Sequence, residues 1–315
     1  MVVKPAHQTP LTMLALAGLL TEAGLPDGVL NVVPTTRAKE MSEALQGDDR
    51  LRKVSFTGST GVGRTLVRQS ADQLQRVSME LGGNAPFLVF ADADLDAAVD
   101  GAMVAKMRNM GEACTAANRF LVHESVAEEF AEKLAARMGA LTVGRGQDEG
   151  VDVGPLIEEK AVESVSQLVT DAVHDGARLL TGGTVPDGPG FFYPPTVLLG
   201  VPADSAINAE EIFGPVLSVT TFKDHDEALS LANDTLYGLG AGVWSRDANT
   251  CYRFGRAIEA GRVWTNCYHQ YPAHAAFGGY KKSGVGRENH KMMLDHYQQT
   301  KNMLVSYSPK KLGFF

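Results

Sequence analysis

The chain has 315 residues, of which 44% are hydrophobic and 21% charged, so it can bury a sizeable core in one large or two ordinary domains. Its formal net charge is −8, and its lysines and arginines are scattered, which argues against a nucleic-acid or membrane partner. Three widely spaced cysteines offer neither a disulfide framework nor a metal knuckle, and no signal peptide or transmembrane run is present. We therefore expect a cytoplasmic protein that acts on small metabolites and holds no metal.

The first eighty residues alternate strands with helices. Thr9 is expected to cap a helix with Pro10 at its first position, and Gly24 to end it. The other expected elements are strands at 1–4, 29–33, 53–56 and 76–81, a helix at 37–45, and a helix that opens after the loop 57–64. This β-α-β order predicts a parallel, doubly wound sheet.

From Pro86 a second set of elements follows, with the acidic turn 91–94 capping its first helix. The expected strands are 87–90, 120–123, 178–180, 196–199, 240–244 and 261–266, and the expected helices are 95–107, 125–138, 158–175, 224–234 and 248–260. The sequence thus predicts an α/β protein.

One cysteine lies in a Gly-containing turn between an amphipathic helix and the strand 120–123. A thiol at such a turn, near backbone N–H groups, is placed where its thiolate can be stabilised and a substrate can reach it. Cys114 is therefore the candidate nucleophile, although a small buried hydrophobe is the commoner role of an arbitrary cysteine.

An acidic residue stands 34 positions before this cysteine, at the end of a strand-like run and directly before Leu81, Gly82 and Gly83. A carboxylate at a strand end beside a closely approached backbone can act as a general base, so Glu80 is the second catalytic candidate. With E-L-G-G followed by G-x-x-C at this separation, the sequence resembles the aldehyde dehydrogenase superfamily. The resemblance implies oxidation of an aldehyde to an acid through a thioester on Cys114.

The loop from Gly58 to Gly63 follows a strand and opens a helix, where a pyrophosphate can use free N–H groups. By itself this loop is weak evidence, because it lacks the G-x-G-x-x-G pattern and such turns are common. The resemblance implies that it is the cofactor loop, with Gly58, Ser59 and Gly63 at the dinucleotide phosphates and Leu81 also in the cofactor site.

Four further positions follow from the resemblance. Lys4 is implied at the adenosine ribose, and His7 stands where NAD-preferring members carry a glutamate. Without that carboxylate, the coenzyme can be either NAD or NADP. That His7 only faces solvent and has no role in coenzyme binding is an equal alternative. The segment E-E-I-F-G-P implies Glu211 at the nicotinamide ribose and Phe213 near the nicotinamide ring; without the other motifs it indicates only an acidic turn.

The substrate pocket combines features of two branches. Residues to about 200 resemble succinate-semialdehyde dehydrogenases, in which an arginine placed like Arg108 pairs with the substrate carboxylate; capping the helix is a nearly equal alternative. Residues from about 210 resemble bacterial acetaldehyde and short-chain aldehyde dehydrogenases, with Phe277 lining the substrate tunnel and 269–276 replacing a serine-containing loop. Succinate semialdehyde is the expected substrate and a short-chain aldehyde the alternative.

The family pattern divides the chain into a partial dinucleotide-binding domain (1–82), a catalytic domain (83–285) and a segment (286–315) that returns to the cofactor domain and supplies an oligomerisation strand. No residues match the family's first strands, part of its oligomerisation arm, or an asparagine that donates to the oxyanion. We therefore expect an N-terminally truncated chain whose full-length form is a homo-oligomer. A cysteine hydrolase or acyltransferase with a histidine base, and an inactive nucleotide-binding protein, remain alternatives of other classes.

Overall fold

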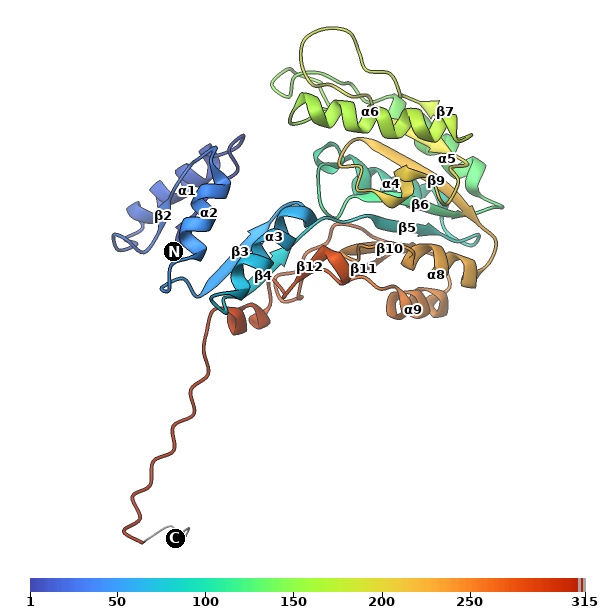
Figure 1. The fold of residues 1–315 in the computed structure, drawn as a ribbon. Helices are drawn as coiled ribbons and strands as arrows, with labels where there is room; N and C mark the ends of the chain where they lie inside the picture. The colour runs from blue at the N-terminus through green and yellow to red at the C-terminus, as the bar shows by residue number, and fades with distance from the viewer. Residues whose placement is uncertain (311–312, 314–315) are drawn as a thin grey trace.

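The computed structural model describes residues 1–310 and 313, which form an α/β fold with three separate sheets (Figure 1). Most strands run parallel and are joined by helices, as the alternating pattern predicts. One small body holds the N-terminal elements, and a larger body holds a seven-stranded sheet with helices on both faces (Figure 1).

The strands of the first eighty residues are divided between two sheets among the described residues, instead of one doubly wound sheet. β1 (Val2–Val3) pairs in parallel with β2 (Asn31–Val32), and β3 (Lys53–Thr57) pairs in parallel with β4 (Arg76–Glu80). A late strand, β12 (Gly284–Val285), returns antiparallel to β4. With two residues each, β1 and β2 form too short a ladder to extend the other sheet.

The first helix, α1 (Leu11–Glu22), buries none of its residues although it is rich in leucine. Pro10 occupies the N-cap position without a side-chain hydrogen bond, so the predicted cap by Thr9 is wrong. The reason is that Pro10 already has helical backbone angles and leaves Thr9 one position further out. α2 (Ala38–Gln46) and α3 (Thr60–Ala71) follow at their expected places.

The large sheet has the strand order β11-β10-β5-β6-β9-β8-β7, and only the β7–β8 pair is antiparallel. Its strands are β5 (Ala85–Val89), β6 (Ala117–His123), β7 (Arg178–Thr181), β8 (Thr196–Leu199), β9 (Val216–Phe222), β10 (Gly240–Trp244) and β11 (Arg262–Thr265). β9 was not predicted, because its apolar run follows a turn that drew attention only as an acidic motif. Its residues are nearly all buried at the centre of the sheet.

Helices cover both faces of this sheet. Phe87 and Phe120 point to the face covered by α4 (Leu95–Met107) and α5 (Ala127–Gly139), where the Asp94 carboxylate caps α4 as predicted by accepting from Ala97 N–H. The neighbouring residues on the same strands point to the opposite face, toward α8 (His225–Asn233) and α9 (Ala248–Ala257) (Figure 1). α6 (Glu159–His174) and the short α7 (Ala206–Ala209) cover the β8 end.

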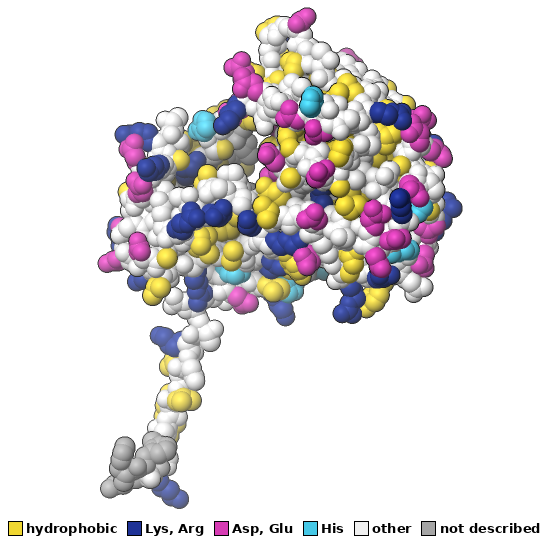
Figure 2. All heavy atoms as spheres, turned by 45° about the vertical axis from the view of Figure 1, so that its right-hand side comes forward, with side chains coloured by type: hydrophobic (Ala, Val, Ile, Leu, Met, Phe, Trp, Pro, Cys, Tyr) yellow, Lys and Arg dark blue, Asp and Glu magenta, His cyan; other side chains and the backbone are white. Residues whose placement is uncertain are grey.

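Two surface features complete the fold. No helix among the described residues combines the length and the hydrophobicity that crossing a bilayer requires. Acidic and basic side chains are interspersed on the face shown in Figure 2. After η3 (Lys291–His296) the chain leaves the body, and residues 297–310 form no strand, so the oligomerisation strand predicted in 286–315 is not seen in that stretch; residues 311–312 and 314–315 lie outside the described residues. Leu304 is 90% exposed (Figure 1).

Candidate active site

Four segments that are distant in sequence meet where β4 leads into β5. Gly58 N–H donates to the Glu80 carbonyl over 3.1 Å, and Leu81 N–H donates to the Ser283 carbonyl over 2.8 Å. Gly83 N–H donates to the Glu211 carboxylate over 3.0 Å. The E-L-G-G segment is therefore the common partner of the glycine loop, the C-terminal motif and the E-E-I-F-G-P motif.

The two glycines of E-L-G-G permit this convergence. A Cβ on Gly82 would overlap the Glu211 carboxylate, and a Cβ on Gly83 would overlap the Cys114 carbonyl oxygen. Only residues without a side chain allow such close approach of backbone to its neighbours. The glycine pair thus allows the backbone of Cys114 to lie directly against the E-L-G-G segment.

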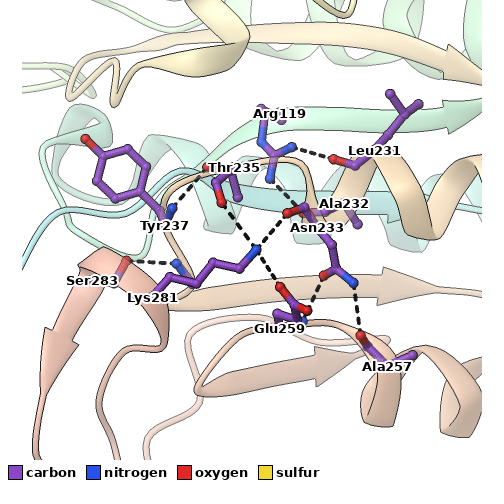
Figure 3. A network of polar contacts seen from close by, with 11 residues as sticks. Arg119, Leu231, Ala232, Asn233, Thr235, Tyr237, Ala257, Glu259, Lys281 and Ser283 are labelled. Carbon is purple, nitrogen blue, oxygen red and sulfur yellow. Dashed lines mark hydrogen bonds and ion pairs between the residues drawn. The ribbon is translucent and has the colours of Figure 1, made fainter.

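A polar network fastens the connection between α8 and β10 beneath this site (Figure 3). Arg119, which is 4% exposed, donates to the carbonyls of Leu231 and Ala232, while Lys281 pairs with Glu259 over 2.7 Å. The Arg119 hydrogen bonds are buried, whereas the Lys281–Glu259 pair is partly exposed to solvent, so the buried arginine is the stronger restraint on the connection.

Ser283 belongs to the same network (Figure 3) and also bonds the E-L-G-G segment. Its hydroxyl donates to the Gly82 carbonyl over 2.6 Å and accepts from Gly238 N–H over 2.9 Å. The F-G-G-Y-K-K-S-G segment therefore joins the α8–β10 connection to Gly82, two residues after Glu80.

Glu80 is a buried carboxylate at the end of β4, with 9% of its surface exposed. Burial raises the pKa of Glu80 from 4.5 to about 7; Glu288 raises it further and Arg287 opposes the shift. One of its carboxylate oxygens has no hydrogen-bond partner among the described residues. A carboxylate with a pKa near neutral and a free oxygen is suited to take a proton from water.

Cys114 lies in the turn between η1 (Arg108–Gly111) and β6 and is half-buried. Burial raises the pKa of the Cys114 thiol to about 11, and the carboxylates of Glu211 and Glu80 raise it further. Hydrogen bonds from the backbone of Cys114 and Thr115 oppose this, as the turn predicted, but they are the smaller effect. The expected stabilisation of the thiolate is therefore outweighed, chiefly by burial and further by the two carboxylates.

Glu211 faces the same space, and its pKa is raised to about 7 by burial, against the Gly83 hydrogen bond and Lys106. Lys106 is fully buried on α4, donates to the Asn118 side chain over 2.8 Å, and has its pKa lowered to about 7 by burial. Sequence reasoning missed Lys106, although a lysine on the otherwise small, apolar face of this helix was a usable signal.

The predicted cofactor loop forms the start of α3. Ser59 occupies the N-cap position in an extended conformation without a side-chain cap bond, and a Cβ on Gly61 would meet open space. Gly63 is buried against Leu81, so closely that a Cβ at this position would overlap the Leu81 side chain. The structure thus places Ser59 at an open helix N-terminus, where anions bind well, and gives Gly63 and Leu81 a packing contact between helix and strand.

Three other predicted cofactor residues lie outside this hydrogen-bonded cluster. Lys4 is exposed and donates to the Pro5 carbonyl over 2.6 Å, and His7 is exposed. Phe213 is 41% exposed with a positive φ of 50°, a conformation that non-glycine residues rarely adopt. It directly precedes Gly214, whose carbonyl oxygen lies where a Cβ on Gly111 would stand, so the backbone of the E-E-I-F-G-P motif lies close to the Cys114 turn.

The predicted substrate residues lie at a cluster of aromatic side chains beside Cys114, which we call the aromatic wall. Its members are Trp264, Tyr268, Tyr271 and Phe277. The Arg108 guanidinium lies 5.8 Å from the Tyr271 ring centre, and the Phe277 ring meets Tyr271 edge-on at 5.7 Å. Arg108 occupies the C-cap position of α4 but makes no hydrogen bond or ion pair with a described residue. The Tyr271 hydroxyl is 2.7 Å from that of Thr115, the residue after the nucleophile. Sequence reasoning missed Tyr271 and Thr115, because they are 156 positions apart and only the fold brings them together.

These features define an α/β protein in which a turn cysteine and a buried carboxylate lie side by side, next to a glycine loop that opens a helix. The family model described as the aldehyde dehydrogenase family matches residues 1–303. The chain belongs to this family, which confirms the resemblance seen in its motifs.

Similar proteins agree with the family and differ in their names. An aldehyde dehydrogenase of Paracoccus denitrificans is 50% identical over 100% of this chain and 63% of its own length. A succinate-semialdehyde dehydrogenase of Paenarthrobacter nicotinovorans is 56% identical over 95% of this chain and 67% of its own length. The chain thus spans about 63% of the length of the first of these curated relatives.

Solved structures confirm the predicted fold. An NAD+ complex of an aldehyde dehydrogenase from Bacillus cereus is 39% identical and superimposes with a TM-score of 0.94, covering 98% of this chain and 62% of that one. A structure described as an E. coli NADP dependent enzyme is 46% identical with a TM-score of 0.92, covering 94% of this chain and 62% of that one.

Proposed function

We propose that this chain carries the reaction centre of an NAD- or NADP-dependent enzyme that oxidises an aldehyde to a carboxylic acid. The observation that carries the proposal is the pairing of Cys114 with Glu80 across Gly83, whose missing side chain lets the two motifs touch. The family membership supports the same reaction.

The chemistry follows from the two side chains. The Cys114 thiolate forms a bond to the aldehyde carbon, and nearby backbone N–H groups, among them that of Cys114, stabilise the resulting oxyanion. A bound nicotinamide dinucleotide supplies the hydride acceptor. Glu80 then takes a proton from water, the hydroxide attacks the thioester carbon, and the C–S bond breaks to release the acid and the thiolate.

The residues present fit a dinucleotide. Ser59 stands at a helix N-terminus without a competing side-chain cap, and the space over Gly61 is open, as a phosphate requires. Glu211 offers a carboxylate to a ribose hydroxyl near Cys114, and His7 leaves the 2′-position without a repelling carboxylate. We propose Lys4, His7, Gly58, Ser59, Gly63, Leu81, Glu211 and Phe213 as the cofactor residues.

For the substrate we propose succinate semialdehyde, with acetaldehyde or another short-chain aldehyde as the alternative. The free Arg108 guanidinium beside Tyr271 supports a substrate with a distal carboxylate. The relatives divide in the same way, since one is named a succinate-semialdehyde dehydrogenase and another, from Cupriavidus necator, acetaldehyde dehydrogenase 2.

A cysteine hydrolase is the competing class, and it needs a histidine base. The nearest candidate in this wall, His269, bonds the Tyr271 hydroxyl through Nδ1 over 2.9 Å, and burial and Arg108 lower its pKa to about 4. Its Nε2 has no hydrogen-bond partner among the described residues, but a pKa of about 4 makes the ring a weak base at neutral pH, which favours the oxidoreductase. We further propose a homo-oligomer and a cytoplasmic location, consistent with three free cysteines.

The test is to mix the purified chain with an aldehyde and each coenzyme and to follow nicotinamide absorbance. Hydride transfer that is lost in Cys114→Ala supports the proposal. Cleavage of a thioester or ester without hydride transfer would assign the site to a hydrolase, and coenzyme binding without turnover would assign the chain to a nucleotide-binding role.

A further inference from the structure

Two arginines face the aromatic wall beside Cys114, and the structure gives them different environments. Arg108 is exposed and makes no hydrogen bond with a described residue. Arg262, at the start of the edge strand β11, is half-buried and makes three hydrogen bonds. Arg108 therefore has all its donors available for a substrate, whereas Arg262 uses three hydrogen bonds on the backbone.

The three hydrogen bonds of Arg262 all go to one loop. One terminal nitrogen donates to the Gln270 carbonyl over 2.9 Å, and the other donates to the carbonyls of Ala275 and Ala276 over 3.3 and 3.0 Å. Trp264, from the same strand, donates its indole N–H to the Gln270 carbonyl as well. The planar, forked guanidinium can reach both ends of the loop at once, which an ammonium cannot do.

The same guanidinium packs against the aromatic rings of the wall. It lies 5.4 Å from the ring centre of Tyr271 and 5.6 Å from that of Phe277. Cation–π contacts of this kind fix ring orientation in addition to the backbone bonds. Tyr271 is thereby held with its hydroxyl between Thr115 Oγ1 at 2.7 Å and His269 Nδ1 at 2.9 Å.

We infer that Arg262 is a positioning residue that clamps the loop 270–276 and so holds Tyr271 against Thr115, making Tyr271 the side chain that limits the width of the substrates reaching Cys114. The inference concerns the geometry around the thiol, and only its consequence for aldehydes rests on the proposed function. The substrates selected would be slender, unbranched aldehydes.

The experiment measures how fast Cys114 is alkylated by a small reagent, iodoacetamide, and by a bulky one, N-phenylmaleimide. Both rates are taken at one pH on the complete chain, so the thiolate fraction cancels from their ratio. Labelling is read by mass spectrometry on the tryptic peptide from Asn109 to Arg119, which distinguishes Cys114 from the other two cysteines. The variants are Arg262→Gln, Arg262→Lys, Tyr271→Phe and the double variant Arg262→Gln/Tyr271→Phe.

Arg76→Gln is the matched control, because Arg76 also holds a segment through backbone carbonyls, those of Asp295 and Gln298, and these lie outside the aromatic wall. It should keep the parent ratio. In Arg262→Gln the ratio of the N-phenylmaleimide rate to the iodoacetamide rate should rise on the order of tenfold. That is the change expected when the aromatic wall loses the free energy of about one hydrogen bond. Arg262→Lys should rescue little of this change.

The double variant decides between positioning and general structure. If Arg262 acts through Tyr271, Tyr271→Phe shifts the ratio in the same direction and the double variant shifts it no further than the larger single change. The inference would be overturned if Arg262→Gln or Tyr271→Phe had the same ratio of alkylation rates as the parent chain, or if the two effects were additive in the double variant. If Arg262→Gln does not fold, Tyr271→Phe and Arg262→Lys still decide the outcome. Failure of aldehyde oxidation would count against the proposed function alone, because alkylation needs no coenzyme.

Discussion

Replacing Glu80 by glutamine should stabilise the folded chain above neutral pH. The folded-state pKa of Glu80 is raised to about 7, against an ordinary value of 4.5, chiefly by burial. Between these values the folded state binds the proton more tightly than the unfolded state does. The stability from this group is therefore complete below pH 4.5 and is lost as the pH rises through about 7. Glutamine resembles the protonated acid and avoids the loss.

The size of the effect follows from the shift. At pH 8 the parent chain has lost on the order of 3 kcal/mol that Glu80→Gln retains, since each pKa unit corresponds to about 1.4 kcal/mol. Glu80 is 9% exposed, so little of this is screened by solvent. Near pH 4.5 the two proteins should have nearly equal free energies of unfolding.

The assay is urea unfolding at pH 5, 6, 7 and 8, followed by the fluorescence of Trp244 and Trp264. Glu163→Gln serves as the control, because Glu163 is an exposed carboxylate on α6, and it should follow the parent at every pH. A difference between parent and Glu80→Gln that stays constant from pH 5 to pH 8 would refute the assignment of Glu80 as a buried group titrating near neutral pH.

Three more predictions follow from the site. Arg108→Gln should raise KM for succinate semialdehyde by roughly 10- to 100-fold and leave acetaldehyde nearly unchanged, by loss of a charged hydrogen bond; equal losses in steady-state kinetics with both substrates would assign Arg108 to structure. His7→Glu should disfavour NADP relative to NAD in coenzyme titrations, and an unchanged ratio would place His7 away from the ribose. Gly83→Ala should cost about 1 to 3 kcal/mol in urea unfolding and alter Cys114 alkylation, because its Cβ overlaps the Cys114 carbonyl. Gly61→Ala, with open space around it, should be neutral or slightly stabilising, and equal behaviour of the two glycine variants would contradict the packing argument.

The parts of the fold that could be predicted are those set by local sequence. The strand Gly240–Trp244 and the helix Leu95–Met107 have the predicted bounds, because a short apolar run and an aspartate cap fix them locally. β9 was missed although it lies inside the large sheet, between β6 and β8, because only the acidic motif directly before it drew attention. The separation of the first strands into two sheets depends on long-range pairing, which local patterns do not determine.

The candidate site divides in the same way. Cys114 and Glu80 were predictable because each stands in a short motif, and the structure shows why the motif needs its glycines. Tyr271 and Glu288 were not predictable, since the loop and the return of the chain after β12 bring them to the site. The raised pKa of Cys114 was also missed, because it arises chiefly from burial in the folded chain and, to a smaller extent, from carboxylates contributed by two other segments.

The central claim is that Cys114 forms an acyl intermediate that Glu80 helps to hydrolyse. The most direct measurement is intact and peptide mass spectrometry of Glu80→Gln after incubation with an aldehyde and NAD or NADP, with Cys114→Ala treated identically. We expect one added acyl group on the peptide Asn109 to Arg119 in Glu80→Gln and none in Cys114→Ala. Aldehyde oxidation by Cys114→Ala, or an acyl group on any residue other than Cys114, would contradict the account.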